Sequence, residues 1–360
     1  MTLHKIKGKL AEGVRMRTRT AYVKAPYQFK IEDVPIRELA SNEVLIKVKA
    51  SGICGTDLHN ASILAKDWMT FGHEIAGIVE KVGEAVKTVK VGDKVALQSS
   101  TYCGKCDLCR NGRNDLCYAG PNYNWGKEPM GFSDYMIAPE ELCVKFDKIS
   151  FEEAAMIEPM GVALDLAYTA DIKLNDDVLV IGLGPIGLMA LRIAKLMGAR
   201  KIYAAQPSRS KRRIELAREY GADEIIFTDK VDIENYKFDK GGVEKVLVTA
   251  PPKVIPRVID TVLYGGIIAF IGIEYGEGAN ITFDANSFHF KKLQLRASYA
   301  VPAIYFPRCI DMVRDGLVDV KKLISHTFKL EDIEKAMLTL KNDKENTVKM
   351  IMVNDLEGIL

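Results

Sequence analysis

One stretch, residues 177 to 210, constrains the fold of this chain more than any other. It opens with a short apolar run, Val178 to Ile181, which is typical of a buried strand. Glycines spaced as G-x-G-x-x-G follow, and a helical pattern of apolar residues then runs to Gly198. A second β-type run begins at Lys201. The order strand, glycine turn, helix, strand predicts the opening unit of a parallel sheet covered by helices.

A glycine turn between a strand and a helix is the setting in which G-x-G-x-x-G binds a dinucleotide. Gly182 permits the tight turn, Gly184 lets backbone amides approach a pyrophosphate, and Gly187 lets helix and strand pack closely. The N-terminus of the helix adds partial positive charge. The predicted dinucleotide site consists of Gly182, Gly184, Pro185, Ile186 and Gly187.

The end of the second strand lacks the acid that ordinarily accepts the ribose 2′-hydroxyl of NAD, about 20 residues beyond the glycines. Counting forward from Gly187 places Gln206 at that position. Counting back from Gly221 places Ser208 there, followed by Arg209. Either register removes a carboxylate that would repel a 2′-phosphate and adds guanidinium groups that suit one. The sequence therefore favours NADP over NAD.

The chain shows two patterns of predicted secondary structure, one before and one after Asp177. A chain of 360 residues is also too long for one ordinary hydrophobic core. From Asp177 onward, strands and helices alternate, as in a parallel sheet with helices on both faces. Before it, short β-type runs such as 43–48, 75–82 and 94–98 predict an antiparallel, barrel-like domain. The segment after residue 300 has no sheet of its own, so we expect it to complete the first domain. The predicted helices of the second half cover 211–220, 252–263, 303–314 and 330–341.

The charge balance excludes some partners. The chain has 50 basic and 48 acidic residues, so no overall field attracts nucleic acid or an acidic membrane. No run reaches the roughly 18 apolar residues of a membrane helix, and we expect a soluble protein. The basic residues among the first 20 lack the apolar core of a secretion signal, which favours a solvated lead-in. The clustering of cysteines favours metal-bound thiolates in a reducing compartment, and hence the cytoplasm.

Four of the seven cysteines form the pattern C-x2-C-x2-C-x7-C, namely Cys103, Cys106, Cys109 and Cys117. Short spacers let four sulfurs converge on one tetrahedral ion, and four thiolates leave no position for a substrate. Free thiols in a surface loop would be prone to oxidation. The pattern therefore predicts a structural zinc that stabilises a lobe and takes no part in turnover.

A second set of metal-suited residues is dispersed along the chain, namely Cys54, His73, Glu74 and Glu158. Taken singly, Cys54 would be an ordinary core residue and His73 an ordinary hydrogen-bonding partner. Together they offer one thiolate, one imidazole and carboxylate oxygens, a composition that leaves one zinc position for an alcohol. With a nicotinamide nearby, such a site suits hydride exchange with the alcohol carbon.

These patterns together resemble the zinc-dependent medium-chain dehydrogenases, and most closely their sorbitol and polyol dehydrogenase branch. The resemblance covers about residue 19 to the C-terminus. Its motifs are GICGTDLH at 52–59, GHE at 72–74, VGDKV at 91–95, the four cysteines at 103–117, EPMGVAL at 158–164 and GLGPIG at 182–187. A glutamate followed by proline, as at Glu158, is the form found in the polyol branch.

The resemblance implies an α/β plus β fold. A GroES-like, barrel-type catalytic domain would comprise residues 1–165 and 300–360, and an inserted Rossmann domain residues 166–299, with the active site in the cleft between them. It implies two zinc ions per chain, one catalytic and one structural, together with NAD or NADP. It also implies a homodimer or homotetramer.

The same resemblance assigns roles within the motifs. The implied ligands of the catalytic zinc are Cys54, His73 and either Glu74 or Glu158. Thr56 would bond the substrate hydroxyl and begin proton release, and His59 would pass the proton toward solvent. Asp57 would orient the histidine ligand.

The implied reaction is reversible hydride transfer between NAD(P) and a secondary alcohol of a polyol, cyclitol or sugar. A simple secondary alcohol or an amino alcohol is the alternative, because the substrate pocket cannot be inferred from sequence. Its candidate wall residues are Trp68, Tyr123, Trp125 and Tyr299. A zinc-ribbon module that binds nucleic acid through Lys105, Arg110 and Arg113 is disfavoured by the balanced charge. An inactive scaffold would lack a metal ligand, and none is missing.

Overall fold

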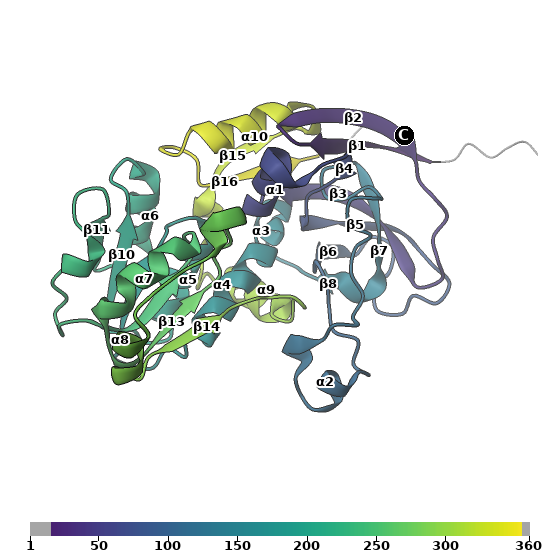
Figure 1. Ribbon diagram of the computed structural model, residues 1–360. Helices are drawn as coiled ribbons and strands as arrows, with labels where there is room; N and C mark the ends of the chain where they lie inside the picture. The colour runs from purple at the N-terminus through teal and green to yellow at the C-terminus, as the bar shows by residue number, and fades with distance from the viewer. Residues whose placement is uncertain (1–15, 355–360) are drawn as a thin grey trace, which may run out of the picture.

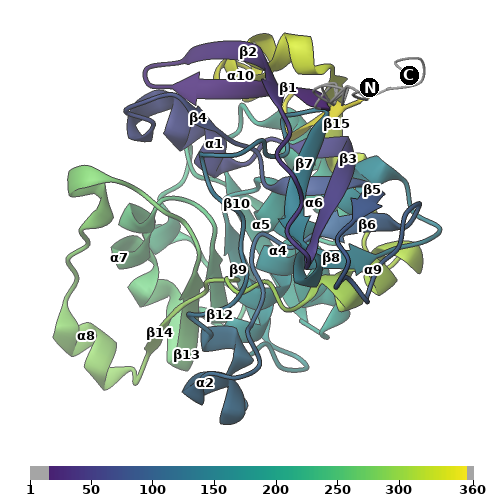
Figure 2. The same ribbon diagram turned by 90° about the vertical axis from the view of Figure 1, so that its right-hand side faces the viewer.

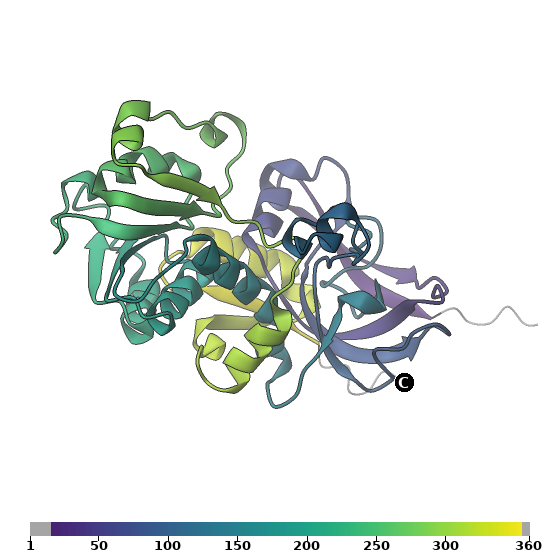
Figure 3. The same cartoon turned by 90° about the horizontal axis from the view of Figure 1, so that it is seen from below.

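The computed structural model describes residues 16–354, which form two bodies joined along one side (Figure 1). The body on the left of Figure 1 contains a parallel sheet, and the body on the right contains two sheets whose strands are mostly antiparallel. The view from below shows the two bodies side by side (Figure 3). Most of the predicted basic lead-in lies outside the described residues. Within residues 16–354, no helix has both the length and the apolarity needed to cross a membrane.

Six parallel strands form one sheet, in the order β11, β10, β9, β12, β13, β14. Their bounds are β9 (Asp177–Ile181), β10 (Lys201–Gln206), β11 (Glu224–Phe227), β12 (Val243–Val248), β13 (Val262–Phe270) and β14 (Gln294–Ala297). The direction of strand addition reverses at β9, which pairs with both β10 and β12. Such a switch point is where open parallel sheets bind ligands, beyond the carboxyl ends of the strands.

Helices cover both faces of the parallel sheet. They are α4 (Ile157–Thr169), α5 (Pro185–Leu196), α6 (Lys211–Tyr220), α7 (Ile255–Val258) and α8 (Ala285–Phe290). Alternate residues of β9 belong to different cores, Val178 and Val180 to one and Leu179 and Ile181 to the other. A strand that is buried on both faces reads as a continuous apolar run, which is how this strand was predicted.

The predicted helix over 252–263 is wrong in its second half. Only Ile255–Val258 is α-helical, and Val262 already belongs to β13, opposite Val243 of β12. Short 3-10 turns flank this helix at Pro252–Val254 and Ile259–Thr261. A β-branched residue in a buried parallel ladder favours the strand, and tertiary pairing outweighs the helical spacing of the apolar residues.

The other body holds a three-stranded sheet, in the order β2, β1, β4, and a seven-stranded sheet. The first comprises β1 (Arg17–Lys24), β2 (Gln28–Pro35) and β4 (Met69–Thr70). The second comprises β3 (Glu43–Gly52), β5 (Glu74–Val82), β6 (Lys94–Leu97), β7 (Tyr135–Pro139), β8 (Cys143–Lys145), β15 (Ile324–Phe328) and β16 (Lys349–Val353). Because β16 pairs with β3, the C-terminal segment completes the sheet of the first domain, as predicted.

Helices in this body are short or peripheral. They are α1 (Gly55–His59), α2 (Asp107–Arg110), α3 (Phe151–Ala155), α9 (Phe306–Arg314) and α10 (Ile333–Asn342). α10 packs beside β2 (Figure 2). α9 starts three residues later than predicted, and Pro307 lies in its first turn, where the missing N–H of proline costs no helical hydrogen bond.

The two bodies share a core and several hydrogen bonds. Met160 of α4 packs in one cluster with Ala76 of β5 and Val180 of β9. Arg213 of α6 donates a hydrogen bond to the carbonyl of Thr347, just before β16, at 3.1 Å. Since α4 runs without a break through residue 165, the predicted domain limits stay a prediction.

Candidate active site

The pairing of β3 with β5 brings three candidate metal ligands together. Gly52, the last residue of β3, lies opposite Glu74, the first residue of β5. Cys54 lies just beyond the end of β3, and His73 just before β5. One ligand atom from each of Cys54, His73 and Glu74 lies within 4.8 Å of the others. Sheet register therefore assembles a thiol, an imidazole and a carboxylate from segments about twenty residues apart.

The surroundings of the buried His73 imidazole favour its protonated, positively charged form. Burial alone would oppose protonation, but the neighbouring Cys54 and then Asp57 raise the pKa of His73 well above its ordinary value. Its Nδ1 has no hydrogen-bond partner within residues 16–354. The Asp57 carboxylate lies 3.9 Å from Nδ1 and instead accepts a hydrogen bond from the Cys54 amide at 2.9 Å. A buried imidazole that lies beside a thiol and a carboxylate fits a zinc ion.

A buried lysine that sequence reasoning missed lies in the same site. Lys349 of β16 forms an ion pair with Oε2 of Glu74 and donates a hydrogen bond to the Ile53 carbonyl at 2.9 Å. Both charged side chains are almost completely buried, at 3% and 1% exposure. Gly52 permits this arrangement, because a Cβ there would lie 2.1 Å from Glu74 Oε2. Lys349 is 275 positions from Glu74, and no local pattern connects the two residues.

Glu158 lies in the first turn of α4 and is not one of the three grouped ligands. Burial raises the pKa of Glu158 to about 7, while nearby His73 lowers it and Glu74 raises it. Glu158, on α4, is therefore close enough for its charge to affect the pKa of His73. Of the two glutamates left open by the sequence, the structure groups Glu74 with Cys54 and His73 and places Glu158 beside that group.

Thr56 and His59 lie three residues apart on α1, so they share one face of this short helix. Thr56 Oγ1 is 3.8 Å from Cys54 Sγ. The His59 ring packs against Tyr275, which follows β13 in the other body. Both residues are partly exposed. Thr56 therefore lies beside the Cys54 thiol, and His59 lies where the two bodies meet.

Two of the four candidate aromatic residues border the metal-suited group. The centroid of the Trp125 ring lies 5.3 Å from that of His73 and 5.7 Å from that of Tyr123. The Tyr123 hydroxyl is buried and has no hydrogen-bond partner within residues 16–354. Trp68 instead packs under Lys30, and Tyr299 is 67% exposed. Trp125 and Tyr123 are therefore the better candidates for a substrate wall.

The four predicted structural cysteines converge in a lobe around α2, at the bottom of Figure 1. The sulfurs of Cys103, Cys106, Cys109 and Cys117 all lie within 4.8 Å of one another. Backbone amides of Lys105 and Cys106 donate to Cys103 and lower its pKa to about 6. Burial and the neighbouring sulfurs raise the pKa of Cys109 to about 12. Four sulfurs that cannot all ionise without a counter-charge fit a divalent cation.

A pocket lies at the carboxyl ends of β9, β10 and β12, and the glycine turn forms part of its wall. Gly182 and Gly184 line this pocket together with Thr249, whose hydroxyl donates to the Gly182 carbonyl at 2.7 Å. At Gly187, a Cβ would lie 1.9 Å from the Gly182 carbonyl oxygen, so this position requires glycine. Pro185 and Ile186 begin α5 and are not among the pocket residues.

The end of β10 is held by side-chain hydrogen bonds. Gln206 accepts from the Leu183 amide at 2.8 Å and donates to Ser210 Oγ at 2.9 Å, so its amide supports the glycine turn. The amide and hydroxyl of Ser208 donate to Asp229, at 2.8 and 2.6 Å. Asp229 follows β11 and was missed, because only the pairing of β10 with β11 brings it here.

Two guanidinium groups line the pocket, from Arg213 of α6 and from Arg257 of α7, and Arg257 already bonds Glu234 and Asp232. Arg209 is exposed outside the pocket wall. Arg213 donates to the Thr347 carbonyl of the other body at 3.1 Å, and burial lowers its pKa. Arg213 lies in the first turn of α6 (Lys211–Tyr220), and the sequence predicts a helix over the same residues. The position of Arg213 at the start of that helix could therefore have marked it as a candidate.

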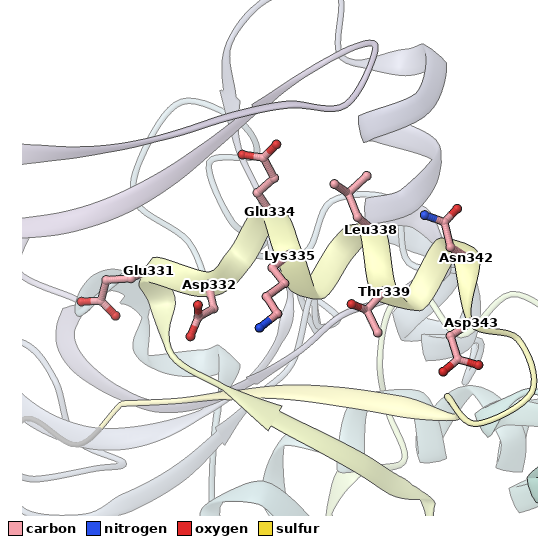
Figure 4. Close-up of a pocket in the computed structure, with 8 residues that line it drawn as sticks. All are labelled: Glu331, Asp332, Glu334, Lys335, Leu338, Thr339, Asn342 and Asp343. Carbon is pink, nitrogen blue, oxygen red and sulfur yellow. The ribbon is translucent and has the colours of Figure 1, made fainter.

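A broad surface depression along α10 shares no residue with these sites (Figure 4). Its wall consists of Glu331, Asp332, Glu334, Lys335, Leu338, Thr339, Asn342 and Asp343. Glu331 already forms an ion pair with Arg19. Because these side chains come from one helix and its preceding turn, they do not enclose a ligand, and we assign the depression no function.

Two family models match the chain. Residues 40–148 match the alcohol dehydrogenase GroES-like domain, and residues 185–315 match the zinc-binding dehydrogenase domain. L-idonate 5-dehydrogenase of Vitis vinifera is 30% identical, over 86% of this chain and 88% of that protein. L-arabinitol 4-dehydrogenase of Aureobasidium melanogenum is 32% identical, over 89% and 90%. D-xylulose reductase A of Aspergillus oryzae is also 32% identical, over 88% and 92%.

Solved structures agree with the fold. An Escherichia coli alcohol dehydrogenase in complex with NADH is 27% identical, with a TM-score of 0.85 over 94% of this chain and 99% of that one. The 2R,3R-butanediol dehydrogenase of Bacillus subtilis is 26% identical, with a TM-score of 0.81 over 94% and 100%. The predicted GroES-like and Rossmann fold is confirmed. The chain belongs to the zinc-dependent medium-chain dehydrogenases, in their polyol dehydrogenase branch, and is an oxidoreductase.

Proposed function

We propose that this protein transfers hydride reversibly between NAD(P) and a secondary alcohol of a polyol, cyclitol or sugar. The observation that carries the proposal is the grouping of Cys54, His73 and Glu74 within 4.8 Å, with Glu158 beside them. The polyol-related names of relatives that match most of the chain support this substrate class. The similarity to a butanediol dehydrogenase keeps a simpler secondary alcohol as the alternative.

Cys54, His73 and Glu74 would hold the catalytic zinc. This ion supplies Lewis acidity that favours loss of the alcohol proton. Glu74 is the preferred third ligand, because its carboxylate belongs to the three-residue group and Lys349 orients one of its oxygens. Glu158, whose buried carboxyl group lies beside these ligands, would form a hydrogen bond at the substrate side.

The proton and the hydride leave the alcohol separately. The hydroxyl proton would pass from Thr56 to His59 and then to solvent, since these residues share one face of α1. The carbinol C–H bond breaks with its electron pair passing to the nicotinamide, and a carbonyl group forms. Trp125 and Tyr123 would cover the apolar C–H face of the substrate, and the buried Tyr123 hydroxyl offers a hydrogen bond to a second substrate oxygen.

We propose NADP as the preferred coenzyme. No acid follows β10, and the Gln206 side chain is turned toward the glycine turn. The nearby carboxylate of Asp229 follows β11, not β10, and already accepts two hydrogen bonds from Ser208. Arg213 in the pocket wall supplies a guanidinium group for a 2′-phosphate. The residues proposed to contact the coenzyme are Gly182, Gly184, Pro185, Ile186, Gly187, Gln206, Ser208 and Arg213, whereas Arg209, which the sequence also suggested, is exposed outside the pocket wall.

The four-cysteine lobe would hold a second, structural zinc, supported by its closed set of sulfurs. The cytoplasm is the proposed compartment, because such thiol sites persist under reducing conditions. A homodimer or homotetramer is also proposed. β14 ends the parallel sheet, and within residues 16–354 its outer edge has no strand neighbour, so a second copy could extend the sheet there.

A screen of polyols, cyclitols and simple secondary alcohols with both coenzymes tests the proposal, together with metal analysis of the purified protein. We expect oxidation of a polyol, tighter binding of NADP than of NAD, and two zinc equivalents per chain. Activity confined to simple alcohols would contradict the substrate class, and clearly tighter NAD binding would contradict the coenzyme preference. A single zinc equivalent would contradict the two-site assignment.

A further inference from the structure

The segment that follows β13 bridges the two bodies. It leaves the parallel sheet after Phe270 and contains a 3-10 turn, Gly276–Ala279, before α8. In Figure 1 this green segment reaches the side of α1 in the other body. There the ring of Tyr275 lies edge-on to the imidazole of His59, with centroids 5.1 Å apart and planes at 83°.

The base of the same segment is held against the coenzyme pocket. A Cβ on Gly272 would lie 1.8 Å from the Ala250 carbonyl oxygen, so the two backbones approach very closely. The turn Gly276–Ala279 contacts the turn Pro252–Val254. Ala250 and Val254 both line the pocket. One short segment therefore contacts the pocket wall at its base and His59 at its tip.

The contact with Tyr275 fixes the plane of the His59 ring without using its nitrogens. Edge-to-face packing orients two rings while leaving polar atoms at the rim free. Within residues 16–354, the hydrogen bond recorded at His59 is accepted by its backbone carbonyl, from Ser62, and none involves the imidazole. Among the described residues, the contact with Tyr275 is thus the interaction that constrains the plane of the His59 ring.

We infer that Tyr275 is a positioning residue that holds His59 in the orientation needed for proton release. The inference rests on the proposed proton path from Thr56 through His59. Tyr275 belongs to the coenzyme-binding body and His59 to the other, so the path is complete only when the two bodies lie together. Tyr275 itself is 37% exposed and is not part of the metal-suited group.

Steady-state polyol oxidation at saturating coenzyme tests this role. We expect Tyr275→Ala to lower kcat about fivefold, with the polyol KM changed less than about twofold, because only proton release is impaired. Tyr275→Phe keeps the ring contact and should retain kcat within about twofold. Added imidazole, a soluble base, should restore most of the rate of Tyr275→Ala and leave the parent unchanged. Phe290→Ala removes an exposed aromatic ring from α8 and serves as the matched control without effect.

A double mutant separates this role from the proposed function. His59→Gln should itself lower kcat, and adding Tyr275→Ala to it should change kcat less than about 1.5-fold. Equal losses from Tyr275→Ala in both backgrounds, or equal losses from the Phe and Ala variants, would overturn the positioning role and leave the proposed function standing. A His59→Gln enzyme with the parent rate would overturn the positioning role together with the proton path. A parent enzyme inactive on every alcohol would overturn both the role and the function.

Discussion

The four-cysteine lobe and the Cys54 site both collect metal-suited side chains, but they are assembled from very different lengths of chain. The lobe takes its sulfurs from 15 consecutive residues, Cys103 to Cys117. The Cys54 site combines residues from the end of β3, the start of β5, α4 and β16. The lobe can therefore form wherever its loop can close, whereas the Cys54 site exists only when the sheet register and the C-terminal strand are in place.

The chemical surroundings differ in the same sense. Around the lobe, mainly backbone amides meet the sulfurs. Around Cys54, charged side chains of both signs meet in a buried space, including Asp57, Glu158 and Lys349. A closed set of identical ligands suits a structural ion, and a mixed set with unsatisfied atoms suits chemistry. The same change should consequently lower mainly activity at the Cys54 site and mainly local stability in the lobe.

The largest expected effect is on activity, from Cys54→Ser. Loss of this ligand removes the Lewis acid of the reaction, and we expect kcat/KM to fall at least about a thousandfold. Metal analysis should show a loss of one zinc equivalent, and the unfolding midpoint should change little. Retention of more than a tenth of the activity with one zinc missing would contradict the assignment of the catalytic metal.

The next effect is on stability, from Lys349→Met. Removing one partner of a buried ion pair leaves the Glu74 carboxylate uncompensated, which costs about 3 kcal/mol of unfolding free energy. Denaturant unfolding measures it, and the cost should be larger after chelation, when the metal no longer compensates Glu74. Lys321→Met, at an exposed lysine, is the matched control.

A double mutant tests the origin of that cost. In Glu74→Gln/Lys349→Met no buried charge is left alone, so part of the lost stability should return. Strictly additive losses would show that Lys349 stabilises the sheet through packing or through the Ile53 carbonyl and not through Glu74.

These contrasts also explain what the sequence could predict. Spacing alone indicated the lobe and the glycine turn, because their atoms converge within a few residues. Cys54, His73 and Glu74 were predicted as a set from residue type and resemblance, but the choice between Glu74 and Glu158 depended on the pairing of Gly52 with Glu74. Lys349 reaches its site only because β16 pairs with β3, which is distant in sequence. Asp229 reaches its site only because β11 pairs with its parallel neighbour β10. The failed end of the 252–263 helix has the same cause, because a strand partner decided it.

A smaller effect is expected from Cys106→Ser in the lobe, which makes the same atomic change as Cys54→Ser. The lobe protrudes from the body, so loss of its metal should melt it locally, with a global cost of about 2 kcal/mol or less. We expect proteolysis within residues 103–117 and one lost zinc equivalent, with kcat within about tenfold of the parent. Complete inactivation of a folded variant that keeps the Cys54 metal would contradict a purely structural role.

The smallest expected effect compares two arginines near the end of β10. Arg209 follows the acid position in sequence and is exposed, whereas Arg213 faces the pocket. If the fold and not the local spacing selects the phosphate ligand, Arg213→Gln should weaken NADP binding about tenfold more than NAD binding, while Arg209→Gln changes either Kd less than about twofold. Because Arg213 also bonds the Thr347 carbonyl, a general loss of stability would weaken both coenzymes equally. The ratio of the two dissociation constants is therefore the informative measurement, and the reverse ranking of the two variants would return the phosphate site to Arg209.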